Sequence, residues 1–258
     1  MRELERSSPP TPGLTALAGS RLAIIGRGRL ATALADALTG RVPHLSGPLG
    51  RDPDLSGADI VLLCVPDAAI AETAAGVPGH ALVGHCSGAT PLSALGLREG
   101  FSLHPLMSVP ASSGAARLRG AAAGIAAGTP RALAVADSIA RAAGMRPFTV
   151  AAEDRAAYHA AASVASNFLV TLEAAAERIA AGTGLSREQL APLVRATVES
   201  WAELGPERAL TGPIARGDEA TVAAQRAAVA ERAPELIELF DTLTTATRAL
   251  AAETTVAV

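Results

Sequence analysis

The sequence contains no lysine, because all 22 basic residues are arginines. This absence excludes Schiff-base chemistry on a lysine and a lysine acting as general acid. Aromatic residues are also scarce, with four Phe, one Trp and one Tyr. Helix packing must therefore depend on aliphatic and small side chains, which favour close contacts between helices.

The sequence also has no excess of basic residues, only two cysteines and no long apolar run. The formal net charge of −3 leaves no excess of cations with which to bind a nucleic acid. The two cysteines, Cys64 and Cys86, lie in apolar runs without CxxC spacing and are expected to be buried, reduced thiols. No stretch stays apolar for the ~20 residues that a membrane span requires. We therefore expect a cytoplasmic protein that binds neither nucleic acid nor membrane, with residues 1–20 as a flexible tail.

Apolar strands alternate with helical segments in residues 21–150, a pattern typical of an α/β fold with a doubly wound parallel sheet covered on both faces. Helices are expected at Leu30–Leu38 and at Ala68–Ala75. Strands are expected at Arg21–Ile25, Ile60–Val65, Ala81–Cys86, Gly100–Leu103, Ala122–Ala126 and Pro147–Val150. This arrangement predicts a Rossmann-like N-terminal domain.

Strand patterns disappear after Val150, and long helical patterns replace them. We therefore predict a domain boundary at residue 150 and a smaller all-helical domain over residues 151–258. Ser186 is a candidate N-cap, and Gly205-Pro206 is a helix stop. Helices are expected at Glu153–Ala181, Ser186–Leu204, Glu219–Ala230 and Pro234–Ala252.

A glycine-rich turn follows the first strand and opens the first helix. Residues 26–31, Gly-Arg-Gly-Arg-Leu-Ala, fit the pattern G-x-G-x-x-G/A. Its glycines permit a tight turn and bring backbone N–H groups close to a pyrophosphate at the positive end of the helix. An ordinary strand-to-helix turn is the simpler alternative, but the position of the motif in the chain favours a dinucleotide site.

Arginines near this turn favour NADP over NAD. An NAD site usually has an acidic residue about 20 residues after the glycines, where this chain has Arg51 followed by Asp52. A guanidinium binds a 2′-phosphate bidentately, and Arg27 and Arg29 add positive charge. Asp52 keeps NAD possible. The remaining predicted cofactor contacts are Gly26, Gly28, Leu30, Val65, Pro66 and Ser87.

A polar stripe on the first C-terminal helix is a candidate for catalysis. His159, Ser163, Ser166 and Asn167 are spaced to share one helix face in an alanine-rich segment. Carbonyl reduction needs a proton donor, which lysine cannot supply here, so the five histidines and Tyr158 remain. Small residues on a helix face also serve close packing, which is the structural alternative for this stripe.

Two further candidates follow apolar runs. Ser87-Gly88 and His104-Pro105 end predicted strands, and ligands of doubly wound folds bind outside the carboxyl ends of strands. For His104 the alternative, slightly favoured, is a turn residue braced by the following proline. His80, His85 and Cys86 crowd around one strand without ligand spacing, so no metal is expected.

Several segments resemble a family of two-domain proteins with a Rossmann-like N-terminal half and a C-terminal domain of unknown function, within the superfamily of the 6-phosphogluconate dehydrogenase C-terminal domain. Ketopantoate reductases and pyrroline-5-carboxylate reductases are relatives. The resemblance rests on residues 25–29, 63–67, 85–89, 102–106, 158–167 and 210–218, the last reading Leu-Thr-Gly-Pro-Ile-Ala-Arg-Gly-Asp.

The resemblance implies a nicotinamide held between the two domains and a homodimer. In ketopantoate reductases and hydroxyacid dehydrogenases a lysine and an asparagine four residues later act on the substrate carbonyl; aligned on Asn167, the lysine position holds Ser163. His159 is then the candidate replacement donor, which implies loss of activity as pH rises through its pKa. Arg216 and Asp218 correspond to a segment that caps the substrate, where Arg216 would meet a carboxylate.

These features predict an NADP-dependent oxidoreductase of a small 2-oxo carboxylic acid, with 2-dehydropantoate as the best candidate substrate and Ser87, Gly88, Arg216 and Asp218 as substrate-binding residues. Two alternatives stay open. One is an imine reductase of the pyrroline-5-carboxylate type, and the other is a non-catalytic NADP-binding sensor or subunit, for which the missing lysine is the main argument.

Overall fold

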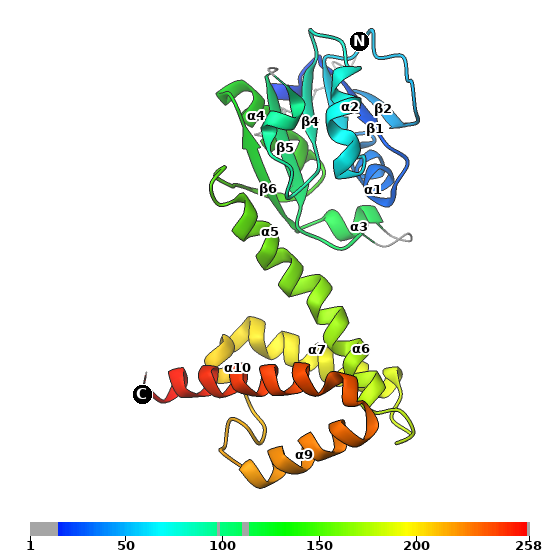
Figure 1. The fold of residues 1–258 in the computed structure, drawn as a ribbon. Coiled ribbons are helices and arrows are strands. Elements are labelled where there is room, and N and C mark those ends of the chain that lie inside the picture. Colours follow the sequence, from blue (N-terminus) through cyan, green and yellow to red (C-terminus); the bar gives the residue numbers. More distant parts are fainter. Residues whose placement is uncertain (1–14, 97–98, 110–113, 257–258) are drawn as a thin grey trace, which may run out of the picture. The chain divides into compact units, whose positions relative to one another are not determined.

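The computed structural model describes residues 15–96, 99–109 and 114–256, and its contacts divide the chain into two units (Figure 1). The first unit ends at Ser166 and the second runs from Asn167 to Val258. The loss of strand patterns after Val150 predicted a domain boundary at residue 150. The units divide later because helix α5 (Arg155–Ser163) bonds to the strands of the first unit through Arg155 and Tyr158.

The first unit is a seven-stranded α/β sheet in the order β2-β1-β3-β4-β5-β6-β7, as the alternating pattern predicts. Strands β1 to β5 are parallel, whereas β6 pairs with β5 antiparallel and with β7 in parallel. The strands are β1 Arg21–Ile25, β2 His44–Leu49, β3 Ile60–Leu63, β4 Leu82–His85, β5 Gly100–Pro105, β6 Ala122–Ala127 and β7 Arg146–Thr149.

Helices cover both faces of this sheet (Figure 1). Helices α1 (Arg29–Leu38), α3 (Gly114–Leu118) and α4 (Pro130–Ala142) pack with Ile24, Leu62 and Phe101 in the larger apolar core. Helix α2 (Ile70–Ala75) and the 3₁₀ turn η3 (Leu92–Leu95) pack on the opposite face, over Val61 and Val83. The 3₁₀ turn η2 (Asp67–Ala69) precedes α2.

Two expectations for the first unit need correction. Strand β2 was not predicted, because its exposed residues and its Gly47-Pro48 pair give neither apolar alternation nor a continuous apolar run. The predicted tail of residues 1–20 lies outside the described residues up to 14, but Thr15–Leu17 form the 3₁₀ turn η1 and Leu17 is buried in the core.

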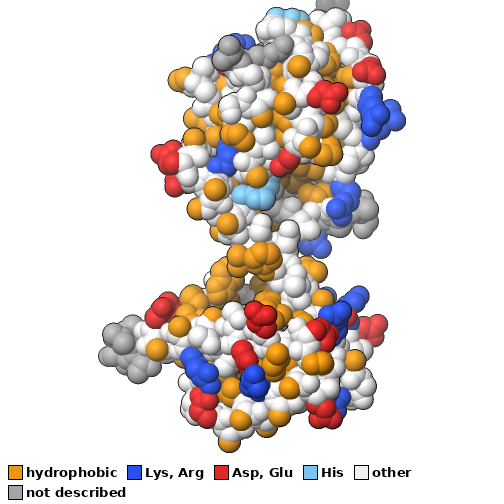
Figure 2. All heavy atoms as spheres, in the orientation of Figure 1, with side chains coloured by type: hydrophobic (Ala, Val, Ile, Leu, Met, Phe, Trp, Pro, Cys, Tyr) orange, Lys and Arg blue, Asp and Glu red, His pale blue; other side chains and the backbone are white. Residues whose placement is uncertain are grey.

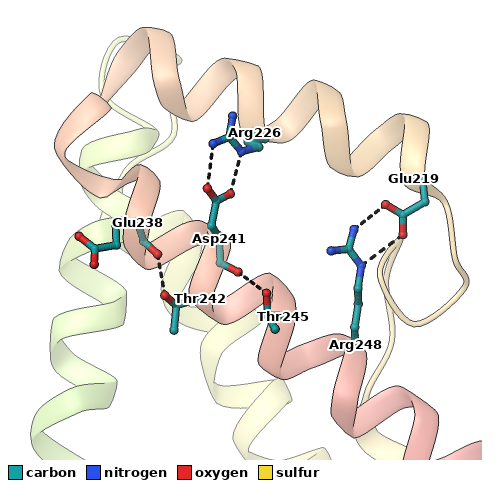
Figure 3. A network of polar contacts seen from close by, with 7 residues as sticks. All are labelled: Glu219, Arg226, Glu238, Asp241, Thr242, Thr245 and Arg248. Atoms are coloured by element: carbon teal, nitrogen blue, oxygen red, sulfur yellow. Dashed lines mark hydrogen bonds and ion pairs between the residues drawn. The ribbon is translucent and has the colours of Figure 1, made fainter.

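The second unit is helical, as predicted. Ser186 caps α7 in a reciprocal capping box with Gln189, which confirms it as the N-cap. Arg226 and Asp241 join α9 to α10, and so do Arg248 and Glu219 (Figure 3). Its elements are α6 Leu169–Ile179, α7 Arg187–Leu204, α8 Pro206–Ala209, α9 Glu219–Arg232, the 3₁₀ turn η5 Pro234–Leu236 and α10 Ile237–Val256.

A π-helical turn, Val164–Phe168, interrupts the long helix that the sequence predicts over Glu153–Ala181. The prediction that His159, Ser163 and Asn167 share a face assumes an unbroken period of 3.6 residues. A π turn breaks that period. In the part of the chain that the structure describes, no helix is long and apolar enough to cross a membrane.

Candidate functional site

The glycine turn lies at the carboxyl end of β1, as predicted. Gly26 has φ 128°, and a Cβ atom there would lie 2.2 Å from the Cys64 carbonyl oxygen. Only glycine fits this position, because the turn brings β1 against the end of β3. A Cβ on Gly28 would meet nothing within 4 Å, so the backbone at the start of α1 is open to a ligand. Gly28 also gives α1 no side-chain cap.

A cleft of about 1310 Å³ opens beside this turn, within the first unit. Its walls come from the ends of β1, β2 and β3 and from α2. Six of the predicted cofactor residues line it: Gly26, Arg27, Gly28, Arg51, Val65 and Pro66. Arg29 and Leu30 form the first residues of α1 instead, and Ser87 is buried at the end of β4.

Arg27 and Arg51 bring positive charge to one wall of the cleft. A Cβ atom on Gly50 would lie 3.0 Å from the guanidinium of Arg27, so this side chain covers the residue next to Arg51. Neither arginine takes part in the ion pairs found among the described residues. Asp52 follows on the same wall with φ 51°. The cleft therefore places two guanidinium groups and one carboxylate beside the glycine turn.

A second group of polar side chains lies at the carboxyl ends of β3, β4 and β5, where α5 begins. We call it the histidine cluster. It comprises Asp67, His85, Ser87, Ser102, His104, Arg155, Tyr158 and His159.

Arg155 connects α5 to β5 and to the segment that follows β4. Its Nη2 donates to the Ser102 Oγ atom at 2.7 Å, and its Nη1 lies 3.4 Å from the carbonyl oxygens of Ser87 and Gly88. The residue is buried, and burial lowers the pKa of its guanidinium. Arg155 therefore fixes the start of α5 and places a positive charge inside the histidine cluster.

Ser87 is held by an acidic partner. Its Oγ donates to Asp67 Oδ2 at 2.7 Å and accepts from the backbone N–H of Thr90 at 2.9 Å. The Ser87 N–H in turn bonds to the Nδ1 atom of His85 at 3.2 Å. Burial, followed by the charge of Arg155, lowers the pKa of His85 to about 4, so this imidazole is neutral at pH 7.

His104 and His159 both lie against Gly88. A Cβ atom on Gly88 would be 2.8 Å from His104 Cε1 and 2.8 Å from His159 Cδ2, so the glycine makes room for both rings. The two ring centroids are 6.2 Å apart. His104 Nδ1 lies 2.7 Å from the Tyr158 hydroxyl. Burial lowers the pKa of His104 and raises that of Tyr158.

The remaining predicted residues lie elsewhere in the chain. Ser163 is partly exposed at the end of α5, and Asn167 is exposed in the π turn at the start of the second unit. Arg216 is exposed in the loop before α9. Asp218 caps α9, accepting from the Thr221 N–H and hydroxyl, and these bonds lower its pKa. That cap is a structural role beside the predicted substrate contact.

Sequence reasoning did not assign three members of the histidine cluster, Asp67, Ser102 and Arg155. Asp67 had a usable signal, because it follows the end of a strong strand as Ser87 does. Ser102 lies within a strand and Arg155 is one of 22 arginines, so neither stands out in the sequence. Tyr158 was considered only as one of several possible proton donors.

Comparisons with known proteins agree with this architecture. The model of a domain of unknown function, DUF2520, matches residues 121–247, which begins at β6 and includes the helical unit up to α10. No curated protein sequence matches the chain.

Three solved structures share the fold. A proposed NADP oxidoreductase from Bacteroides fragilis has 20% identity and a TM-score of 0.74, covering 90% of this chain and 99% of its own. Protein TM1727 from Thermotoga maritima has 24% identity and a TM-score of 0.74, with the same coverage. The NADP-bound pyrroline carboxylate reductase of Plasmodium falciparum has 13% identity and a TM-score of 0.55, covering 90% of this chain and 98% of its own. The chain therefore combines a Rossmann-like fold with a region, residues 121–247, that matches the DUF2520 model.

Proposed function

We propose that this protein is an NADP-dependent oxidoreductase of a small 2-oxo carboxylic acid. The observation that carries the proposal is the cleft beside Gly26 and Gly28, with Arg27 and Arg51 on one wall. A 2′-phosphate gives these two guanidinium groups an anionic partner. The Bacteroides fragilis neighbour, itself a proposed NADP oxidoreductase, supports the same cofactor.

Residues of the first unit would hold the cofactor. The backbone at Gly28 and the start of α1 would face the pyrophosphate, and Val65 and Pro66 would line the path along the end of β3. The bound nicotinamide would supply a hydride to the substrate carbon. The histidine cluster, also at the carboxyl edge of the sheet, would supply the proton that the reduced oxygen needs.

The best candidate substrate is 2-dehydropantoate, which would be reduced to pantoate. A carboxylate next to the carbonyl would give Arg216 a bidentate partner, and His104, His159, Ser163 and Asn167 are the candidates for acting on the carbonyl. Ser87, Gly88 and Asp218 complete the proposed substrate contacts.

A second candidate is reduction of a cyclic imine that carries a carboxylate. The pyrroline carboxylate reductase among the structural neighbours favours this alternative. An imine requires protonation at nitrogen, whereas a ketone requires a donor to oxygen, and Arg216 would serve either acid.

Purified protein, NADPH and each acid in turn would test the proposal through loss of nicotinamide absorbance. Turnover of 2-dehydropantoate is the expected result. Turnover only of the imine would select the second candidate, and tight NADPH binding without turnover of any keto or imino acid would assign the protein as a sensor. Arg216→Ala should mainly raise KM, because an anchor for the carboxylate binds the ground state and the transition state equally.

Two helix variants would test the catalytic stripe. If His159 and Asn167 act on the carbonyl, His159→Ala and Asn167→Ala should each lower kcat. Parental turnover in both variants would assign the stripe to packing. As a control, Gln225→Ala at an exposed position of α9 should keep the parental kcat.

We also propose that the protein is a homodimer formed through the second unit. Figure 2 shows apolar side chains on the surface of the helical unit among charged ones. Val170, Leu193 and Trp201 are 69%, 65% and 56% exposed, which is unusual for large apolar residues on neighbouring helices. A second copy would cover them.

A further inference from the structure

The bond between His104 and Tyr158 determines which nitrogen of the imidazole carries the proton. Tyr158 lies on α5, and a Cβ atom on Gly124 of β6 would be 2.8 Å from its hydroxyl oxygen. The missing side chain lets the phenol lie directly over the sheet. There its oxygen is 2.7 Å from His104 Nδ1, and the two rings meet edge to face with centroids 5.6 Å apart.

Acid strength sets the direction of this hydrogen bond. A phenol is a stronger acid than a neutral imidazole N–H, and an imidazole nitrogen is a stronger base than a phenol oxygen. The Tyr158 hydroxyl therefore donates and His104 Nδ1 accepts. A neutral His104 with an accepting Nδ1 must carry its proton on Nε2.

Charged and titratable groups surround His104 from several elements. Arg155 and His159 face it from α5, Asp67 from η2 and His85 from β4. Burial and the two neighbouring cations, His159 when protonated and Arg155, lower its pKa, whereas Asp67 opposes them. At neutral pH His104 is therefore an uncharged donor rather than an imidazolium ion.

We propose that His104 gives its Nε2 proton to the substrate oxygen and that Tyr158 is the positioning residue that holds and replenishes this proton. The inference rests on the proposed function, since it names the proton donor of the same reaction. A neutral imidazole in this role matches the general pattern of an electrophile kept uncharged by its surroundings.

The step balances within the histidine cluster. The carbonyl carbon would take the hydride that a bound NADPH supplies, and the C=O π electron pair would move onto the oxygen. That oxygen takes the Nε2 proton of His104 while Nδ1 takes the hydroxyl proton of Tyr158. The phenolate, stabilised by the neighbouring Arg155, regains its proton from water.

Nitrogen NMR of the protein without cofactor or substrate tests the tautomer directly. With ¹⁵N-labelled histidine, His104 is assigned by the signal that His104→Gln removes. We expect a protonated Nε2 and an accepting Nδ1 at pH 7.5. Tyr158→Phe should remove this preference and give a mixture of tautomers, whereas the control Phe148→Leu, which alters the ring packed on Tyr158, should keep it. A protonated Nδ1 in the parent protein, or an unchanged tautomer in Tyr158→Phe, would overturn the proposal.

Kinetics on a substrate found in the panel test the catalytic consequence. Tyr158→Phe should lower kcat about 10²-fold with little change in KM, and Gly124→Ala should act in the same direction by displacing the hydroxyl. The parent kcat should fall as pH drops through the lowered pKa of His104 and stay level from pH 7 to 9. Parental kcat in Tyr158→Phe, or a decline that starts near pH 6.5 as pH rises, would overturn it. If no acid is reduced, the proposed function fails, while the NMR result still decides the tautomer.

Discussion

The two units of this chain bury their apolar residues to very different extents. The first unit has two apolar cores around its sheet, with Leu34, Leu62 and Phe101 fully buried. In the second unit the described buried residues are Ala180, Val222, Val229, Ala233 and Thr244, of which none is large. The first unit therefore has a large apolar core of its own, whereas the helices of the second unit leave large apolar side chains exposed, which the proposed homodimer would cover.

Polar contacts do not replace the missing core of the second unit. The arginine pairs between α9 and α10 in Figure 3 are geometrically good, but their side chains are exposed. Exposed ion pairs contribute little to stability because water screens them and their side chains lose entropy. These pairs fix how α9 and α10 are aligned with each other more than they stabilise the unit.

The largest expected effect comes from deleting core volume in the first unit. Leu62→Ala should lower the free energy of unfolding by about 2–5 kcal/mol, because it leaves a cavity in a fully packed sheet. Leu193→Ala in the second unit should change the unfolding of the monomer by less than about 0.5 kcal/mol. Urea unfolding monitored by circular dichroism measures both variants. Equal losses would show that the difference in burial has no energetic counterpart.

A charged substitution on the exposed apolar face of the second unit tests whether a second copy covers that face. Leu193→Asp should dissociate the proposed homodimer, because it loses about 2–3 kcal/mol of apolar burial for each copy and buries a carboxylate. Sedimentation velocity should give a dimer for the parent and a monomer for the variant. Gln225→Asp on α9 adds the same charge to an exposed polar position and is the control. A parent protein that sediments as a monomer contradicts the dimer.

Lowering the pH should reduce the stability of the first unit, because all five histidines lie there. In the folded state the pKa of His85 is about 4, below its ordinary value of 6.5. Between these two pKa values the unfolded chain binds a proton at His85, whereas the folded chain does not. Stability is therefore complete above pH 6.5 and declines as the pH falls toward 4. Between pH 7 and pH 5 the loss should be about 2 kcal/mol.

Urea unfolding at both pH values measures this loss, and His85→Gln should reduce it. His80→Gln, at an exposed position in the same unit, should leave it unchanged. A parent protein with equal stability at pH 7 and pH 5 would exclude a neutral, buried His85.

The sequence predicted those features whose cause is local. Apolar runs identified six strands of the sheet, and the two glycines after β1 identified the turn, because their spacing is a local pattern even though Gly26 packs against the distant Cys64. Arg51 was found through a spacing rule of the fold. Local pattern therefore led to most of the cleft.

The features that escaped prediction depend on contacts distant in sequence. β2 is an exposed edge strand, and the antiparallel direction of β6 follows from the path of the chain rather than from its own residues. The role of Arg155 follows from its hydrogen bonds to Ser87 and Ser102, which lie more than 50 positions earlier in the chain. The same holds for Tyr158, whose partner His104 is on β5.

The smallest expected effect concerns cofactor preference, because the proposed cofactor cleft lies within the first unit. NADPH should bind more tightly than NADH, because Arg51 lies on the cleft wall after β2, where a 2′-phosphate would be held. Arg51→Ala should reduce that preference by about 1–3 kcal/mol, the range of a charge-assisted hydrogen bond, while NADH affinity stays near the parental value. Calorimetric titration of both nucleotides measures the difference. Arg146→Ala, which removes an exposed arginine bonded to the Gly120 carbonyl oxygen, is the matched control and should keep the preference. Equal affinities of the parent protein for NADPH and NADH would contradict the role of Arg51 and would leave Asp52, its neighbour on the same wall, as the residue that holds the ribose.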